Sequence, residues 1–576
     1  ETLFESEDIT INPGNEESEQ PENTENVEQV GEMQTQSSSR TYEDLFMENV
    51  RNLGPMRRRR IPKRFSDDAC PAVDSLTSEI DEPSGMEDAL KSEHSKHWKD
   101  AMISEYTSLM ENETWELVPP EENQNVVGSR WVYKVKRNED GSVDRFKARL
   151  VAQGYTQTRG TDYEEVFSPV AKHTSLRTLL ALANEHDLEV HQMDVKTAFL
   201  NGELDHDIYM SQPEGFVDED NPNYVYKLRR SIYGLKQSAR CWNTTLDEYL
   251  KSAGYRKSGA DGCIYIKSIK NDDGHISFVI LGVYVDDLIP VSNDIDMLNS
   301  EKEALCQRFK MDDRGEAHYL LGMLIKRDRR AKTLSISQQS YTEKMLKRFG
   351  MELCKPIATP LESGKKFHEL SSDDESFDTQ TYQQAIGCLT YMSVTTRPDI
   401  AAAVGILSQY MSKPSKEHWL GVKRVLRYLK GTVNYGIKYC SNKEKDLVGY
   451  CDSDWAGDID TRKSTSGYVF QLGNSAVSWS SRKQATVARS STEAEYVALS
   501  SATQEAIWLR RLMGDIGKKM DSPIIVYEDN QGAIELTKNA KYHGRTKHID
   551  ISHHFVRERV ISIEIMVKYC PTNEMV

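Results

Sequence analysis

The sequence lacks any apolar segment long enough to cross a membrane. No uninterrupted apolar run reaches about 18 residues, the length at which a helix can span a bilayer. The start of the chain also lacks the basic, apolar and small-residue regions of a secretory leader. We therefore expect an intracellular protein that is not embedded in a membrane.

Cysteine is present, but in no metal-binding arrangement. The nine cysteines include no C-x-x-C pair and have no histidine partner at zinc spacing. The sequence therefore predicts reduced thiols and no structural zinc site. The nine positions are Cys70, Cys241, Cys263, Cys306, Cys354, Cys388, Cys440, Cys451 and Cys570.

Negative charge is concentrated at the start of the chain. The formal net charge of −17 would argue against binding of nucleic acid. Residues 1–50, however, hold 14 acidic residues and one basic residue, and the rest of the chain has 72 basic and 76 acidic residues. This nearly balanced remainder neither supports nor excludes a local basic channel.

Residues 1–84 differ in composition from the rest of the chain. They are rich in Glu, Ser, Asn and Pro and have no apolar period of 3.6 or 2.0 residues. Such a segment cannot bury enough surface to offset its conformational entropy, so we predict a disordered acidic tail or linker. The basic run at residues 57–64 could contact phosphates or serve as a nuclear import signal, and is equally explained as a solvated patch.

Apolar periodicity begins near residue 86. Residues 98–110 have helical spacing, whereas residues 130–136 and 146–151 alternate on either side of Asp140-Gly141 and predict a β-hairpin. Basic and aromatic residues are interleaved in the hairpin, as a groove for phosphates and bases would require, although a solubilising strand face fits equally well. The basic residues are Arg130, Lys134, Lys136, Arg145, Lys147 and Arg149.

The middle of the chain predicts a helix, two buried strands and a helical region. A turn at residues 168–169 precedes a helix through residue 182, and residues 188–195 and 278–288 are apolar runs. The helical spacing then returns three times before a second α/β unit begins near residue 447. The three helices are expected at residues 382–395, 400–410 and 417–429.

Acidic residues lie within the two apolar runs. Asp194 stands at the end of the first run, and Asp286 and Asp287 lie in the second. Buried carboxylates are costly unless a cation such as Mg²⁺ cancels their charge. Two such ions can bridge a triphosphate, activate a primer hydroxyl and stabilise the leaving pyrophosphate. A lone Asp-Asp doublet is weak evidence, since those at 272–273 and 312–313 fit solvated turns.

A second acidic set follows residue 447. Strands are expected at residues 448–455, 467–472, 476–480 and 524–527, and Ser490 starts a helix as its cap. Acid stands after the first strand, in this helix, after the fourth strand and in a last helix. These residues are Asp452, Glu495, Asp529 and Asp550, with Asp454 and Glu493 as alternatives two residues away.

Several motifs together resemble those of one family of enzymes. Tyr-Val-Asp-Asp at residues 284–287, between apolar strands and downstream of Asp194, resembles the palm signature of reverse transcriptases. Four further blocks occur in the order found in the copia-type retrotransposon enzyme, and the resemblance covers roughly residues 85–576. These blocks are GSRWVYK at 128–134, FKARLVAQG at 146–154, AFLNG at 198–202 and YGLKQSARCW at 233–242.

The resemblance implies a role for individual residues of the polymerase. Asp194, Asp286 and Asp287 match the metal-binding triad. Phe199 matches the bulky side chain that abuts the sugar 2′ position, although it could be an ordinary core residue. Residues 320–323 resemble the hairpin that grips the primer end. The remaining nucleotide-pocket positions are Gln237, which resembles the pocket glutamine, and Lys147 and Arg149, which match the fingers residues that hold the triphosphate.

The second acidic set resembles that of an RNase H. Asp452, Glu495, Asp529 and Asp550 match its Asp-Glu-Asp-Asp set, which holds two Mg²⁺ ions about 4 Å apart to activate water and stabilise the leaving 3′-oxygen. His543 could assist product release, and a structural or solvent-exposed histidine explains it equally well.

The expected fold is a multidomain α+β and α/β protein. It comprises a right-hand polymerase with fingers, palm and thumb, followed by an RNase H-like α/β domain. The predicted divisions are a disordered tail at 1–84, fingers and palm at 85–330, thumb and connection at 331–445, and the RNase H-like domain at 446–576.

The resemblance implies an RNA-directed DNA polymerase with RNase H activity. Its cofactor would be Mg²⁺, two ions per active site, with Mn²⁺ as a substitute. Its partners would be an RNA template, a DNA primer and product, the RNA–DNA hybrid and dNTPs, with no membrane. No integrase or protease motif is present, so we expect part of a longer polyprotein, with integrase and protease as further parts. The expected location is a cytoplasmic virus-like particle, with nuclear entry open.

Two other functions were weighed against this one. The first is a domesticated or decayed element product that binds nucleic acid without catalysis. The presence of all seven proposed metal carboxylates disfavours decay. The second is a Ca²⁺-binding or scaffold protein, which would need a repeated D-x-D-x-D-G loop ending in Glu, and the sequence contains none.

Overall fold

The structure is a computed structural model that describes residues 46, 49, 81–137, 142–272, 274–441, 446–473, 475–538 and 550–575, without the side chains of 137 and 550–553. It is a mixed α/β multidomain protein with two compact units, each assembled from separate stretches of chain. The described part of the first unit comes mainly from Pro83–Glu164 and Leu204–Leu235, and that of the second from Glu165–Glu203 and Lys236–Val576. The four domain divisions expected from the sequence stay a prediction.

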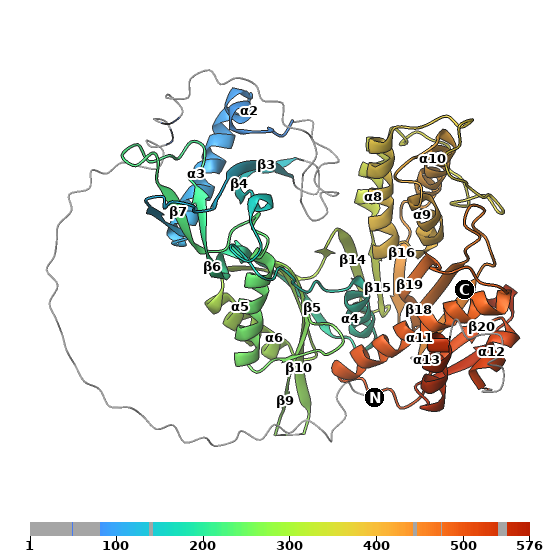
Figure 1. Ribbon diagram of the computed structural model, residues 1–576. Helices are drawn as coiled ribbons and strands as arrows, with labels where there is room; N and C mark the ends of the chain where they lie inside the picture. Colours follow the sequence, from blue (N-terminus) through green and yellow to red (C-terminus); the bar gives the residue numbers. More distant parts are fainter. Residues whose placement is uncertain are drawn as a thin grey trace. The chain divides into compact units, whose positions relative to one another are not determined.

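The described part of the first unit includes the helices α2 and α3, a four-stranded sheet and a separate hairpin (Figure 1). In the sheet, β1 is antiparallel to β7, and β2 is parallel to β6. The sheet order is β1 (Trp115–Val118), β7 (Val225–Arg230), β6 (Glu203–Ser211) and β2 (Val126–Val127). The other elements are α2 (Met86–Lys91), α3 (Ser95–Glu111), β3 (Ser129–Arg137) and β4 (Val143–Ala152).

The predicted helix at residues 98–110 and the predicted hairpin are both confirmed, and they pack on each other. α3 buries Trp98, Met102, Tyr106 and Leu109 on one face, as the helical spacing requires. The Trp98 ring lies edge-on to Tyr133 of β3 at 5.3 Å between centroids. This contact fixes which face of the hairpin points inward.

Strand alternation separates the basic and aromatic residues of the hairpin onto opposite faces. Trp131 and Tyr133 are buried, whereas Lys134 pairs across the strands with Lys147, and Lys136 pairs with Arg145. The expectation that interleaved aromatic residues contact bases is therefore not met by these two rings, because successive strand residues point to opposite faces. A basic face remains.

Two residues of the predicted disordered tail are described, and both contact the first unit. Phe46 is fully buried, and its ring lies 5.2 Å from that of Phe216. Asn49 donates a hydrogen bond to the Val217 carbonyl at 2.9 Å. The chain departs from the predicted tail at these two positions, and the basic run at residues 57–64 lies outside the described residues.

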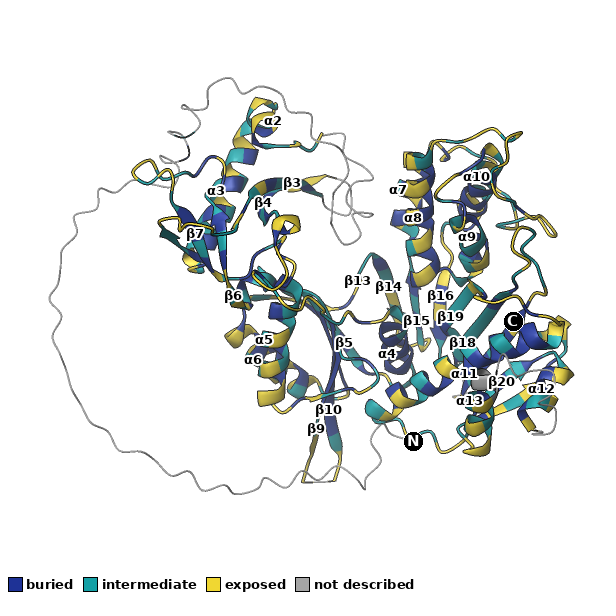
Figure 2. Ribbon diagram, in the orientation of Figure 1, coloured by how far each residue is buried: buried dark blue, intermediate teal, exposed yellow. Residues whose placement is uncertain are grey.

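The second unit contains a six-stranded sheet. Its central strands carry residues of both predicted apolar runs, and α4 (His173–Glu185) matches the helix expected after the turn at 168–169. Figure 2 shows α4 as a largely buried helix. The sheet order is β12 (Met311–Glu316), β5 (Glu189–Val195), β11 (Asp287–Ser292), β10 (Ile276–Tyr284), β9 (Ile264–Lys270) and β8 (Arg256–Lys257).

The apolar run at residues 278–288 was expected to form a buried strand. It forms two strands joined by a tight turn. β10 ends at Tyr284 and β11 begins at Asp287, and the two strands are antiparallel. Val285 has a φ of 57°, which a β-branched residue rarely adopts. The apolar pattern hides this turn because both strands are buried on both faces and so carry no polar alternation.

The chain then forms a four-stranded sheet and a helical cluster. The helices predicted at 382–395, 400–410 and 417–429 correspond to α8 (Thr379–Thr395), α9 (Ala401–Ser408) and α10 (Lys416–Gly431). With α7 (Gln339–Arg348), they share one apolar core. The sheet order is β13 (Tyr319–Leu320), β14 (Met323–Asp328), β15 (Thr333–Ser337) and β16 (Gly436–Cys440).

A five-stranded sheet follows, with strands in the order β19-β18-β17-β20-β21. β18 is antiparallel to both β19 and β17, whereas β20 is parallel to both β17 and β21. All of its elements except β21 and α12 (Gln531–Lys538) agree with the strands and helices expected from the sequence. The elements are β17 (Leu447–Ser453), β18 (Thr465–Leu472), β19 (Ser475–Lys483), α11 (Ser491–Asp515), β20 (Ile524–Glu528), α13 (Asp550–Ile561) and β21 (Ile565–Tyr569).

The described part of the chain bears on membrane-spanning helices and on the cysteines. No described helix combines the length and the apolar character needed to cross a membrane. All cysteines that the structure describes are free thiols, in agreement with the predicted reduced state.

The fold predicts a different cost for two glycine substitutions. Gly234 has a φ of 93°, and a Cβ there would overlap the Ala152 carbonyl at the end of β4. Gly254 has a φ of 88°, with the nearest side-chain atom at an ordinary 3.7 Å. Gly254→Ala should lower the free energy of unfolding by about 1–2 kcal/mol, and Gly234→Ala by more. Chemical denaturation checks this, and equal losses would contradict the overlap.

Candidate active sites

Strand pairing brings the three proposed polymerase aspartates to one end of the six-stranded sheet. Asp194 of β5 and Asp287 of β11 are direct partners across the antiparallel pair. Asp286 lies in the turn between β10 and β11, and its carbonyl accepts a hydrogen bond from the Val195 amide at 2.9 Å. Asp194 and Asp287, 93 positions apart in sequence, are therefore neighbours at this sheet end.

The environment of Asp287 favours its neutral form. Burial, foremost, raises the pKa of this carboxyl to about 6, and the charges of Asp286 and Asp194 add to the effect. A hydrogen bond from Gln192 Nε2 to Asp287 Oδ1, at 3.0 Å, acts in the opposite direction. The aspartates thus repel each other, and a cation bound between them would relieve that repulsion.

A basic side chain already contacts one of these aspartates. Arg314 of β12 donates from Nη2 to Asp194 Oδ2 at 2.7 Å. Beside it, Lys196 forms an ion pair with Asp312 at 2.6 Å. Among the described residues, these three aspartates do not offer carboxylate oxygens that all lie within 4.8 Å of one another.

Phe199 and Gln237 lie on adjacent elements of the same unit. Phe199 belongs to the 3-10 helix η3 (Ala198–Asn201), which follows Thr197 in a left-handed conformation and contacts α5 (Ser238–Ser252). Phe199 is half-buried, so it is not a fully enclosed core residue. Gln237 precedes α5 as its N-cap residue and is fully buried.

Lys147 and Arg149 lie on β4 in the first unit, whereas the three aspartates belong to the second. Burial and the positive charge of Arg149 lower the pKa of Lys147, while Glu105 opposes that shift. The guanidinium of Arg149 lies over the Tyr233 ring, 4.7 Å from its centroid. Both cations thus belong to the basic face of the hairpin.

The hairpin expected to grip the primer has a defined turn. β13 and β14 are antiparallel, and Leu321 and Gly322 both have positive φ. The Tyr391 hydroxyl donates to the Leu321 carbonyl at 2.5 Å and supports this turn.

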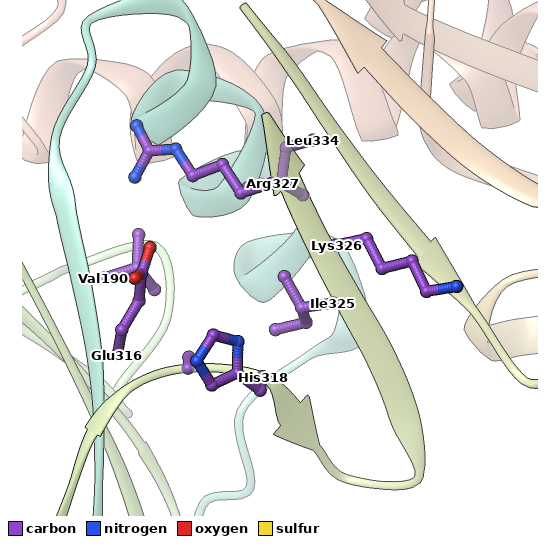
Figure 3. A pocket seen from close by; sticks show the side chains of 8 residues that line it. Val190, Glu316, His318, Ile325, Lys326, Arg327 and Leu334 are labelled. Carbon is purple, nitrogen blue, oxygen red and sulfur yellow. The ribbon is translucent and has the colours of Figure 1, made fainter. Parts of the chain in front are cut away.

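A hollow of about 240 Å³ is lined by residues of β5, β12, β14 and β15, and Figure 3 shows Glu316 and His318 among the side chains that line it.

A second acidic cluster lies at the ends of two parallel strands. β17 and β20 are parallel neighbours, so Asp452 on β17 and Asp529 directly after β20 come to the same sheet edge. Glu495 reaches this edge from α11, and each of the three offers a carboxylate oxygen within 4.8 Å of the others. Among the described residues, only these three form such a group.

The geometry and charge of this cluster fit a divalent cation. Oε2 of Glu495 is buried and has no hydrogen-bond partner. Burial, foremost, and the charges of Glu528, Asp452 and Asp529 raise the pKa of Glu495 to about 9. Although Asp452 keeps contact with solvent, partial desolvation and the Asp529 charge raise its pKa as well. Mg²⁺ takes such hard oxygen ligands and removes the repulsion that these shifts express.

Two residues beside this cluster were missed by the sequence analysis. Glu528 is fully buried and accepts a hydrogen bond from Cys451 Sγ at 3.1 Å, and burial raises its pKa to about 7. Alternation along β20 could have placed it, since Ile524, Val526 and Glu528 share the buried face. The Thr572 hydroxyl donates to Asp529 Oδ2 at 2.5 Å, and no sequence pattern around Thr572 indicates this contact.

The alternative acids contact the backbone instead. Asp454 accepts a hydrogen bond from the Thr465 amide at 2.6 Å, and Glu493 accepts one from the Arg489 amide at 3.0 Å. Asp550 begins α13, ahead of β21 in the chain, and its side chain lies outside the described residues. His543 also lies outside them.

Comparisons with known proteins agree with the sequence resemblance. Residues 112–363 match a family model described as reverse transcriptase (RNA-dependent DNA polymerase). The chain is 42% identical over 87% of its length to a retrovirus-related Pol polyprotein from transposon TNT 1-94 of Nicotiana tabacum, of which it spans 38%. It is 35% identical over 54% of its length to the whole of a Ty5-1 transposon protein of Saccharomyces cerevisiae.

Among solved structures, the chain is similar to a foamy viral protease–reverse transcriptase in complex with RNA/DNA hybrid, with 12% identity and a TM-score of 0.42 over 81% of this chain and 52% of that one. The chain belongs to the reverse transcriptase family of copia-type retrotransposon Pol polyproteins.

Proposed function

We propose that this chain copies RNA into DNA and degrades the RNA strand of the resulting hybrid. The observation that carries the proposal is the direct pairing of Asp194 with Asp287, with Asp286 in the adjoining turn, inside the region that matches the reverse transcriptase family. The cluster of Asp452, Glu495 and Asp529 supports the second activity.

In the polymerase site, Asp194, Asp286 and Asp287 would hold the divalent cations. Mg²⁺ would there supply charge stabilisation for a triphosphate, and Mn²⁺ could replace it. For both oxygens of the Asp194 carboxylate to serve as ligands, Arg314 would have to release Oδ2. Asp287, whose pKa of about 6 lies close to neutrality, would be held in its charged form by the same cations.

The nucleotide would lie near Phe199 and Gln237. The half-buried ring of Phe199 would abut the sugar 2′ position and exclude ribonucleotides, and Gln237 would line the pocket from the start of α5. Lys147 and Arg149 would contribute positive charge to the triphosphate from the fingers. The partners are an RNA template, a DNA primer and dNTPs.

In the RNase H-like site, Asp452, Glu495 and Asp529 would hold the cations that hydrolysis of RNA requires. The chemistry supplied by Mg²⁺ would be activation of water and stabilisation of the leaving 3′-oxygen. The sheet order β19-β18-β17-β20-β21 supports an RNase H-like arrangement, since it brings Asp452 and Asp529 to one edge. Asp550 is proposed as the fourth acid.

The wider setting follows from the family. Integrase and protease would be further parts of the same polyprotein, and the place of action would be a cytoplasmic virus-like particle with access to the nucleus. Since the chain spans 38% of the tobacco polyprotein, these statements concern the longer protein.

Primer extension on poly(rA)/oligo(dT) with Mg²⁺ is the most direct test. We expect dTTP-dependent extension of the DNA primer that stops when EDTA removes the metal. A folded protein that binds the template–primer but never extends it would instead support the non-catalytic alternative.

Substituting one carboxylate at each site should separate the two activities. Asp286→Asn should lower DNA synthesis by at least about a hundred-fold, the loss typical when a group that stabilises transition-state charge is removed. RNA cleavage should persist because the second cluster has its own carboxylates. Asp452→Asn is the matched control and should have the reverse effect. Primer extension near the wild-type rate by Asp286→Asn would refute the polymerase assignment.

A smaller residue at position 199 should weaken the choice between sugars. Phe199→Ala or Phe199→Val should reduce selectivity for dNTPs over rNTPs by about ten- to a hundred-fold, since the ring no longer occupies the space of a 2′-hydroxyl. Single-nucleotide incorporation measures this ratio. Unchanged selectivity with lowered stability would mean that Phe199 only packs the fold.

Metal binding at the second cluster should change the stability of the folded protein. Because the folded pKa of Glu495 is raised to about 9, its contribution to stability is fully present below its unfolded pKa and is lost as pH rises toward 9. Glu495→Gln should remove this pH dependence and, without divalent ions, raise the melting temperature by about 2–4 °C per kcal/mol of relieved repulsion.

Mg²⁺ should offset the same loss in the wild type and have little effect on the Gln variant. Thermal unfolding between pH 5 and 9, with Mg²⁺ or EDTA, checks both expectations. A wild-type protein whose stability ignores Mg²⁺ would argue against a cation at this cluster.

A further inference from the structure

An exposed tryptophan lies close to the acidic cluster of the five-stranded sheet. Trp455 follows β17 by two residues and is 58% exposed. It stands three residues after Asp452, so the Cα atoms of the two residues are at most about 11 Å apart. A single exposed apolar side chain needs no explanation, so a role for this ring depends on what surrounds it.

The indole of Trp455 is bonded to a second segment that leads into the same cluster. Its Nε1 donates a hydrogen bond to the Ala488 carbonyl at 3.3 Å. Ala488 lies between β19 and α11, the helix that carries Glu495. Because this bond uses the only polar atom of the ring, the exposed remainder of the indole is apolar carbon.

Both neighbours of Trp455 in the chain are held by hydrogen bonds. Asp454 Oδ1 accepts from the Thr465 amide at 2.6 Å, and the Asp454 amide donates to the Thr465 carbonyl at 3.2 Å. On the other side, the Ala456 amide donates to Oγ of the fully buried Ser464 at 3.0 Å. Since the loop is already ordered, little conformational entropy would be lost when the ring meets a ligand.

The residues on either side of Ala488 add a second exposed apolar side chain and a positive charge. Val487 is 48% exposed. Arg489 is also exposed, and its guanidinium forms no hydrogen bond or ion pair with any residue that the structure describes. An aromatic face next to an available cation suits a nucleic acid, which offers apolar sugar and base surface beside each phosphate. A second copy of this chain could cover the ring, but the unpaired cation favours a polyanion.

We propose that Trp455 and Arg489 form a binding surface for the RNA–DNA hybrid at the edge of the acidic cluster. The exposed face of the indole packs on a sugar or base of one strand, and Arg489 pairs with a phosphate. The inference rests on the proposed cleavage of RNA and deepens it, because this surface holds the hybrid while the Asp452 cluster acts on its RNA strand. Trp455 binds substrate in this scheme and takes no part in the hydrolysis itself.

Hydroxyl-radical labelling read by mass spectrometry tests this contact without requiring activity. In EDTA and low salt, the full chain can bind a blunt RNA–DNA hybrid through phosphate charge without cutting it. Trp455 should lose labelling as hybrid is added. Tyr435, which is 59% exposed and lies between α10 and β16, is the matched control and should keep its labelling.

Two results of this labelling would overturn the proposal. The first is full labelling of Trp455 at saturating hybrid. The second is protection that appears without hybrid as the protein concentration rises, which would assign the surface to a second copy of the chain.

Single-turnover cleavage of a short blunt hybrid measures binding at the acidic cluster, since a hybrid held elsewhere on the chain is not cut. Trp455→Ala should raise the half-saturating protein concentration about ten-fold, the effect of losing one aromatic contact with a nucleotide. Trp455→Phe keeps a ring but loses the Nε1 donor, and it should stay near the wild-type value, as should Tyr435→Ala. Equal losses for the Ala and Phe variants would mean that the ring only anchors its loop to Ala488, against the proposal.

Salt dependence separates the ring from the charge. Because an indole releases no counterions, Trp455→Ala should weaken binding by the same factor at every salt concentration. Arg489→Gln should reduce the slope of log affinity against log salt by about one, since one phosphate contact is lost. A changed slope in Trp455→Ala, or an unchanged slope in Arg489→Gln, would contradict the roles given to these residues.

Failure of the proposed function gives a different result from failure of this surface. A wild type that loses Trp455 labelling on hybrid but never cuts RNA would defeat the proposed cleavage and support the surface. A wild type that cuts RNA while Trp455 keeps its full labelling would support the cleavage and defeat the surface.

Discussion

Mutual repulsion between carboxylates is the constraint around which the second unit is organised. Glu495 is held with Asp452 and Asp529 close enough for all three to share one ion, and its Oε2 has no donor. Fully buried Glu528 adds a fourth acidic group beside them. Such an arrangement persists only because the surrounding strands and α11 are stable enough to hold it, and a cation bound there would convert its cost into binding energy.

Strand geometry explains how distant residues come to form these clusters. Asp194 and Asp287 meet through an antiparallel pair, and Asp452 and Asp529 meet at the shared edge of two parallel strands. A strand end is a rigid platform for a functional side chain, because the ladder fixes its backbone while the end leaves the carboxylate accessible. The same logic serves both candidate sites, although their sheets have different topologies.

Periodicity in the sequence predicted the elements whose stability is local. The helix α3, the β3–β4 hairpin and the helices α8, α9 and α10 were found because one face is apolar and the other is not. Periodicity did not mark the turn at Val285, because an apolar run buried on both faces carries no alternation to show its end, and only the motif at residues 284–287 indicated it. Strand β21 was missed for a different reason, since it is a short edge strand that forms only against β20.

The candidate sites show the same division between local and tertiary information. The acidic motifs could be selected from sequence because carboxylates within apolar strands are chemically conspicuous. The contacts of Arg314 with Asp194 and of Thr572 with Asp529 could not, since each joins residues far apart in the chain and neither residue lies in a recognisable motif.

The buried Arg177 of α4 is another residue whose role depends on contacts between distant parts of the chain. Its donors satisfy carbonyls that α8 and β19 leave available, so the residue is explained only when all three elements are considered together. A sequence pattern would assign it to the polar face of an amphipathic helix. Its burial instead shows that this position of α4 packs against α8 and β19, where the three carbonyls offset part of the cost of burying a cation.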